Sequence, residues 1–368
     1  MEFTIHHQIL TAVFVVAIVM GVVANKTNFC TMGAVSDWVN MGDTGRLRAW
    51  LLATAVAMLG VAVLTGAGLA SIGNSTFPPY RTPNFAWLRY LLGGLMFGVG
   101  MTLASGCGNK TLVRVGGGNL KSLVVLAIAS ACAYLMLWTD FYGTVFHSWI
   151  AATTIDLGKS GMSSQAVSEL FGSGGGVQVA TGAAIGLALA GFAFASKDFR
   201  GNFDNILGGL VIGLAVVIGW YLTAGPTGAS WKEWAELADT VPSRVEVQSY
   251  TFISPMGDSV RFLTSPSFAN INFGITALVG VIAGSFLYAI LSGNFRIEWF
   301  VSGGDFLNHA IGAVLMGIGG VLSMGCTVGQ AITGMSTLAM GSMLTFIAIV
   351  AGAAATMKLQ YWRMMKEA

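Results

Sequence analysis

The chain has 368 residues, of which 55% are hydrophobic and only 9% are charged. A soluble domain carries roughly 25% charged residues, so this chain lacks the polar side chains needed to cover a soluble globule of its size. The composition therefore excludes an ordinary cytosolic enzyme, a nucleic-acid-binding protein and a disordered chain. A formal net charge of +2 favours no strongly charged partner.

Several apolar stretches are long enough to cross a bilayer, which takes about 20 helical residues. We predict an all-α polytopic membrane protein with about nine transmembrane helices and additional short re-entrant helices. The predicted spans are 8–24, 49–71, 89–105, 121–140, 176–195, 206–224, 271–291, 308–324 and 339–357.

The loops indicate an orientation, because Lys and Arg concentrate on the cytoplasmic side of membrane proteins. Basic residues exceed acidic ones at 106–121 and in the tail after 357, whereas acidic residues exceed basic ones at 141–175 and 225–270. Nine spans then predict an external N-terminus and a cytoplasmic C-terminus. Arg81 is an exception, since its loop at 72–88 falls outside. Aromatic residues in 225–270 indicate an ordered external segment, but its role cannot be inferred.

A glycine-rich pattern occurs twice at an offset of 219 residues. Residues 93–107 and 312–326 both read G-x4-G-x-G-x2-L-x2-G-C. On the nine-span count the two copies run in opposite directions, as in transporters built from inverted repeats. We therefore expect one membrane domain with a first repeat at 1–140, a connector at 141–205 that contains the fifth span, and a second repeat at 206–368, the whole resembling an hourglass.

Short polar segments follow the Gly-Cys pair of each copy, and a related segment at 28–34 contains Cys30. They are too short to span, so we predict re-entrant half-helices that line a buried path. A helix N-terminus favours an anion. A thiol is soft and polarizable, which suits an anion that itself carries sulfur. Cys132 lies inside an apolar helix and reads as a packing residue.

The candidate substrate-binding residues come from these three segments. They are Cys30, Gly106, Cys107, Asn109, Lys110, Gly325, Cys326, Thr327 and Gln330. Lys110 would attract an anion, although it serves equally well as a topology signal. The Asn, Thr and Gln side chains would donate hydrogen bonds or satisfy the loop backbone. We expect no catalytic residue, metal site or cofactor, because the corresponding motifs are absent.

These residues resemble the YeeE/YedE sulfur-transport family of bacterial inner-membrane proteins. The matching motifs are N-F-C at 28–30 followed by Gly33, A-S-G-C at 104–107 with R-V-G at 114–116, and G-A-V-L-M-G at 312–317 with G-C-T-V-G at 325–329. The resemblance implies thiosulfate uptake through an hourglass of inverted halves, with Cys30, Cys107 and Cys326 along the path. It also implies a small cytoplasmic sulfur-carrier protein as a partner of some members.

The resulting hypothesis is an inner-membrane permease that passes a small sulfur-containing anion, most simply thiosulfate, between cysteine thiols. Three alternatives remain open at this level. The first is a membrane-embedded enzyme of thiol redox or sulfur transfer that uses Cys107 or Cys326 as nucleophile. The second is an importer of another sulfur or selenium species, and the third is a channel for neutral solutes.

Overall fold

The computed structural model describes residues 4–172, 174–238 and 241–367. Within these ranges nine helices are long and apolar enough to cross a membrane. They are α1 (Ile5–Lys26), α3 (Gly45–Gly66), α4 (Trp87–Leu103), α6 (Leu120–Trp138), α8 (Gly175–Phe194), α10 (Phe203–Ala224), α13 (Phe273–Leu291), α14 (Gly303–Leu322) and α15 (Met340–Glu367). The prediction of an all-α polytopic membrane protein is confirmed.

Shorter elements connect these helices. They are α2 (Thr31–Ser36), η1 (Asp37–Met41), β1 (Asn84–Phe85), α5 (Gly108–Gly116), η2 (Gly143–His147), α7 (Ser148–Thr153), β2 (Ile155–Asp156), η3 (Leu157–Ser160), η4 (Val167–Leu170), α9 (Lys197–Gly201), α11 (Pro226–Leu237), α12 (Ile253–Thr264), η5 (Phe268–Asn270) and η6 (Val328–Gly334). The two strands pair antiparallel, with Asn84 opposite Asp156.

Two predicted spans end five or more residues from the ends of their helices. The second was drawn to residue 71, but α3 ends at Gly66 because Gly68 adopts a left-handed conformation with φ of 68°. Glycine enters that conformation at no steric cost and commonly ends helices. The ninth was drawn to residue 357, but α15 continues to Glu367 and carries the basic tail as exposed helix.

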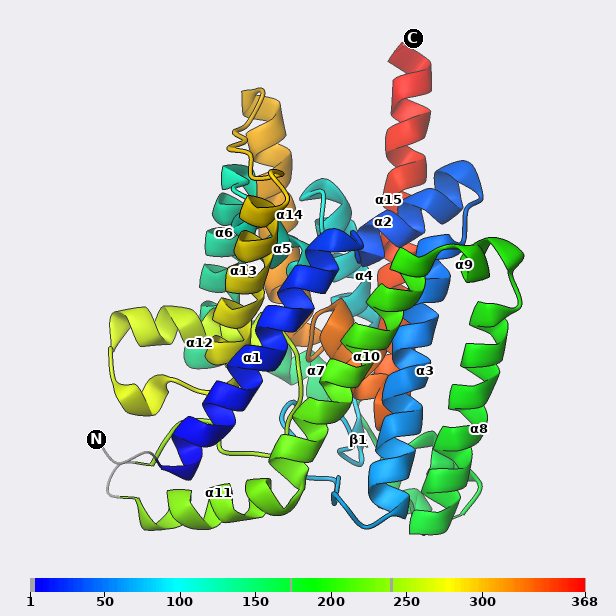
Figure 1. The fold of residues 1–368 in the computed structure, drawn as a ribbon, viewed down its shortest axis with the longest axis vertical. Coiled ribbons are helices and arrows are strands. Elements are labelled where there is room, and N and C mark those ends of the chain that lie inside the picture. The colour runs from blue at the N-terminus through cyan, green and yellow to red at the C-terminus, as the bar shows by residue number, and fades with distance from the viewer. Residues whose placement is uncertain (1–3, 173, 239–240, 368) are drawn as a thin grey trace.

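The long helices pack in crossed pairs, in which one helix comes from the first half of the chain and the other from the second half. Helix α1 lies along α13 and α10 lies along α3, while α4 lies along α15 and α14 lies along α6 (Figure 1). Suppose that α1, α3, α4 and α6 correspond, in this order, to α10, α13, α14 and α15. The pair α1–α13 then has its counterpart in α10–α3, and the pair α4–α15 has its counterpart in α14–α6. Helices α4 and α14 then correspond to each other, and they also pack together. Two halves related by a twofold axis give this contact pattern.

Glycines allow α4 and α14 to approach closely, and their contacts are reciprocal. A methyl group added at Gly93 would lie 2.8 Å from the carbonyl oxygen of Gly319, and one added at Gly319 would lie 2.8 Å from that of Gly93. Methyl groups at Gly100 and Gly312 would each lie 2.6 Å from the other residue's carbonyl oxygen. Small residues at such crossings bring the backbones together where lipid supplies no hydrophobic driving force.

Each of these two helices ends in the same reversal of the chain. After α4, Gly106 N–H donates to Met101 O and Ser105 has a φ of 57°. After α14, Gly325 N–H donates to Gly320 O and Met324 has a φ of 61°. This is the Schellman arrangement, with a left-handed residue where glycine is usual. The reversals direct the Gly-Cys pairs back into the molecule.

The segments after the reversals differ by one residue. Left-handed residues 105 and 324 are 219 positions apart, whereas the next such pair, Gly118 and Leu338, is 220 apart. The first copy forms the α-helix α5, and the second forms the π-helix η6. A π-helix takes one more residue per hydrogen-bonded turn, so it accommodates the extra residue.

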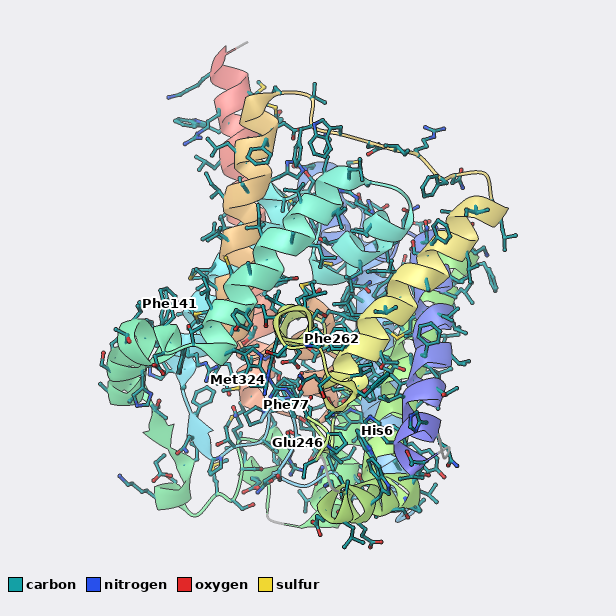
Figure 2. The ribbon with its side chains drawn as sticks, turned by 90° about the vertical axis from the view of Figure 1, so that its left-hand side faces the viewer. His6, Phe77, Phe141, Glu246, Phe262 and Met324 are labelled. Carbon is teal, nitrogen blue, oxygen red and sulfur yellow. The ribbon has the colours of Figure 1, made fainter. Side chains whose placement is uncertain are left out.

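The segment at 225–270, which we expected to be an ordered external segment, contains the helices α11 and α12, which have different roles. Helix α11 lies across one end of the molecule, opposite the C-terminus (Figure 1). Helix α12 instead points inward and is seen end-on in Figure 2, with Phe262 near its outer end. Its first six residues, Ile253 to Asp258, are all buried. Helix α12 is thus a further re-entrant element, which the sequence analysis did not predict.

Candidate functional site

Each of three cysteines begins a short helical segment. Cys30 precedes α2, Cys107 precedes α5, and Cys326 lies two residues before η6. The Cys30 sulfur accepts from Gly33 N–H and the Cys326 sulfur accepts from Gly329 N–H, both at 3.5 Å. The Cys107 sulfur contacts the N–H of Lys110, also three residues on. The thiols therefore occupy the position that Ser, Thr or Asp usually takes at a helix N-terminus.

The three thiols gather at one place. The side chains of Cys30 and Cys107 contact each other, and the Cys107 thiol also faces the Thr327 hydroxyl. A methyl group added at Gly108 would lie 3.5 Å from Cβ of Cys326. The exposed fractions of the three cysteines are 4%, 0% and 0% in chain order. The structure therefore brings the three thiols into one buried cluster.

Backbone N–H groups surround this cluster from four segments. The N–H of Thr31, in α2, faces the Cys107 sulfur in addition to that of Lys110, in α5. The Cys326 sulfur faces the N–H groups of Val328 and of Phe252, which lies directly before α12. Four helical segments thus direct their N-termini at the cluster. The partial positive charge of these N-termini favours a bound anion.

Several buried polar atoms beside the thiols have no hydrogen-bond partner. Asn109 is 1% exposed, and neither its amide nitrogen nor its amide oxygen is paired. The hydroxyl of Thr31 is buried and unpaired as well. A buried unpaired polar group costs about 1–3 kcal/mol, so its presence indicates a site for a ligand.

Positive charges lie beside the cluster on one side. The Lys110 ammonium donates to Asn28 Oδ1 at 3.0 Å and lies near both Cys30 and Cys107. The Arg46 guanidinium lies near Cys30 and forms an ion pair with Asp37. The charge of Lys110 is therefore available to a bound anion, whereas that of Arg46 is largely neutralised.

Other candidate residues support the turns. Gly106 and Gly325 make the Schellman hydrogen bonds described above. The Gln330 amide nitrogen donates to the carbonyl oxygen of Ser323, while its amide oxygen is buried and unpaired. Gln330 thus completes the end of α14 and does not direct its donor toward the thiols. Cys132 lies apart, with its Cβ against Gly317 of α14.

Thr31, Thr251 and Tyr80 also lie at the site and were not predicted from the sequence. The Tyr80 hydroxyl lies beside Thr251 and would be 3.3 Å from a methyl group added at Gly329. Burial raises the pKa of Tyr80 well above that of a free phenol, so its hydroxyl stays protonated and can donate. One signal was available for Thr251: the following residues, F-I-S-P-M-G at 252–257, resemble F-C-T-M-G at 29–33 with one insertion.

A cavity lies between the cluster and the end of the molecule that carries the C-terminus. It has a volume of about 700 Å³, and its lining includes Met32 of α2, Ser105 of the first reversal and Tyr361 of α15. Met32 and Ser105 are each two residues from a cluster cysteine. The described residues contain no group of three or more His, Cys, Asp or Glu side chains that could hold a metal ion.

In the part of the chain that the structure describes, nine apolar helices long enough to cross a membrane enclose a buried cluster of thiols at helix N-termini, an arrangement typical of a polytopic membrane transporter. A family model described as "Sulphur transport" matches residues 26–355, and the chain belongs to this family. The resemblance to YeeE/YedE proteins is thereby confirmed. The family makes this chain a transporter, and the alternative of a membrane-embedded enzyme was wrong.

Two curated relatives carry the same description. The thiosulfate transporter TsuA of Escherichia coli (strain K12) is 25% identical over 328 residues, which cover 84% of this chain and 83% of the relative. The thiosulfate transporter TsuA of Spirochaeta thermophila (strain ATCC 700085 / DSM 6578 / Z-1203) is 24% identical over 350 residues, covering 92% and 94%. The similarity thus extends over nearly the whole length of each chain.

Proposed function

We propose that this chain is an inner-membrane permease that imports thiosulfate, with its N-terminus outside and its C-terminus in the cytoplasm. The observation that carries the proposal is the cluster of three buried thiols at four helix N-termini, beside unpaired buried polar groups. The names of the two relatives, both thiosulfate transporters, support the choice of substrate.

The chemistry of the cluster fits thiosulfate, a small dianion with an exposed sulfur atom. Backbone N–H groups and the Lys110 ammonium would stabilise its negative charge. The thiols would donate weak S–H hydrogen bonds, and their polarizable sulfur atoms suit a sulfur ligand. Cys326 would receive the anion first, and Cys107 and Cys30 would pass it on.

Transport requires that the anion can move from one binding site to the next. An anion must be bound strongly enough to leave water and weakly enough to move on. The side chains of Cys30 and Cys107 touch. Gly108, the residue after Cys107, lies against Cys326. A short displacement would therefore exchange one thiol partner for the next, without a covalent intermediate.

The crossed helix pairs support two inverted repeats at 1–140 and 206–368, with the connector and α8 between them. In that arrangement α5 and η6 approach the centre from opposite sides of the membrane. The small cytoplasmic sulfur-carrier protein implied by the family resemblance remains a prediction.

Growth tests the proposal. A bacterium that cannot take up sulfate is supplied with thiosulfate as its only sulfur source and with the gene intact or as Cys326→Ser. Growth with the intact gene alone is expected. Growth with both would remove Cys326 from the mechanism, and no growth with verified membrane protein would contradict thiosulfate import. Fusion of a periplasm-active phosphatase to the C-terminus, expected to be inactive, tests the orientation.

A further inference from the structure

Arg81 lies in a place where an unpaired charge is costly. It belongs to the connection between α3 and α4 and is 7% exposed. One guanidinium nitrogen donates to Ile72 O at 2.7 Å, but Nε is buried without a partner. Within the described residues Arg81 forms no ion pair, and the nearby carboxylate Glu169 accepts hydrogen bonds from Ser163 and Ser164.

Arg81 lines a cavity of about 490 Å³. The other polar side chains in its lining are those of Thr65, Ser71, Asn74 and Gln178, and no carboxylate of the described residues lines it. The Thr65 hydroxyl, like Arg81 Nε, is buried and unpaired. A cavity with one cation, several neutral donors and two unpaired polar groups suits a small oxyanion.

The position of this cavity relates it to the thiols. Helix α3 ends at the side of the molecule opposite the C-terminus (Figure 1), and the cavity adjoins that end through Thr65 and Gly68. Tyr80, the residue before Arg81, has its hydroxyl beside Gly329, whose N–H donates to the Cys326 sulfur. Tyr80 and Arg81 are adjacent in the chain, and the first lies beside the Cys326 turn while the second lines the cavity.

This location also accounts for an exception in the charge pattern. Arg81 lies on the side that the other loops make external, where positive charge is disfavoured. A functional role in attracting an anion from outside accounts for an arginine on that side.

We propose that the Arg81 cavity is an outer binding site, which takes up a small oxyanion before it passes Tyr80 to Cys326. The proposal rests on the proposed function for the identity of the anion, thiosulfate. Electrostatic capture in a cleft raises the local concentration of an anionic substrate. Loss of the site should therefore raise KM and leave the maximal rate of uptake nearly unchanged.

Uptake of radiolabelled thiosulfate by cells tests this inference. For Arg81→Gln we expect KM to rise at least tenfold, with the maximal rate within twofold of the wild type. Lys159→Gln, which removes an exposed charge from another loop, is the control and should leave KM within twofold. An unchanged KM for Arg81→Gln would overturn the inference.

A second pair of variants leaves Arg81 and its hydrogen bond to Ile72 in place. Ser71→Asp brings a negative charge into the cavity, whereas Ser71→Asn has a similar size and no charge. Only the aspartate variant should raise KM, and equal KM values for the pair would overturn the inference. This comparison decides the question if Arg81→Gln does not reach the membrane.

Binding to the purified protein separates this inference from the proposed function. If wild-type cells take up no thiosulfate, the proposed function fails, and calorimetric titration with thiosulfate and with sulfate still tests the cavity. Weaker binding of either anion by Arg81→Gln and Ser71→Asp would support the site. Equal binding by both variants and the wild type would overturn it.

Discussion

Gly108 offers a direct test of the space between the thiols. A methyl group at this position would lie 3.5 Å from Cβ of Cys326 and 3.7 Å from Cε of Met256, which are ordinary van der Waals contacts. Gly108→Ala therefore fits the resting structure. Because alanine is the better helix former, the variant should be as stable as the wild type or more stable, by at most about 1 kcal/mol.

The same methyl group should slow transport. Forcing an extra methyl group into packed space costs about 1–3 kcal/mol. If the anion passes between Cys107 and Cys326, that cost is added to its barrier and slows uptake roughly 5- to 150-fold. Gly117→Ala is the matched control: its methyl group would lie 3.4 Å from Arg114 O, at the other end of α5.

Initial rates of radiolabelled thiosulfate uptake, normalised to membrane protein, and thermal unfolding in detergent measure both effects. We expect slow uptake with undiminished stability for Gly108→Ala, and wild-type behaviour for Gly117→Ala. Normal uptake by Gly108→Ala would refute the assignment of the path. Loss of both uptake and stability would refute the packing argument.

Three further predictions concern the cluster and its scaffold. Cys107→Ser should lose most thiosulfate uptake while Cys132→Ser keeps it; equal uptake by the two would contradict a role for the thiol. Asn109→Leu removes two buried unpaired atoms, so thermal unfolding should show equal or higher stability while uptake falls about tenfold, and undiminished uptake would count against a ligand there. Gly100→Ala should destabilise the protein by about 1–3 kcal/mol because its methyl group would lie 2.6 Å from a backbone carbonyl oxygen, whereas Gly191→Ala on α8 has open space and should not. Similar unfolding temperatures for these two variants would show that the α4–α14 crossing tolerates more separation than its geometry indicates.

The helices that cross the membrane could be predicted from the sequence, because a bilayer requires about 20 apolar residues in a row. Their ends were less predictable. Apolar residues continue beyond Gly66, but the left-handed turn at Gly68 ends α3. The direction of each re-entrant segment was also indicated, since a short polar segment after a Gly-Cys pair cannot continue across lipid.

Helix α12 was not predicted, because its sequence is not apolar enough to span the bilayer and its likeness to residues 29–33 is short and interrupted by one residue. It carries Asp258, which reads as a loop residue. The structure instead buries that carboxylate, which accepts from Trp138, from Arg244 and from Asn272. These partners are 14 or 120 residues away along the chain, so only folding brings them to the carboxylate.

The sequence by itself determined the class of protein, the number of spans and the residue types of the cluster, because composition and apolar length follow directly from the chain. The tertiary structure alone decided that Cys30, Cys107 and Cys326 meet in one place. That meeting depends on two glycine-lined helices crossing at close range and on two left-handed residues, Ser105 and Met324, that turn the chain inward. Contacts between residues more than 200 positions apart depend on backbone geometry at a few points, which no local pattern of residues specifies.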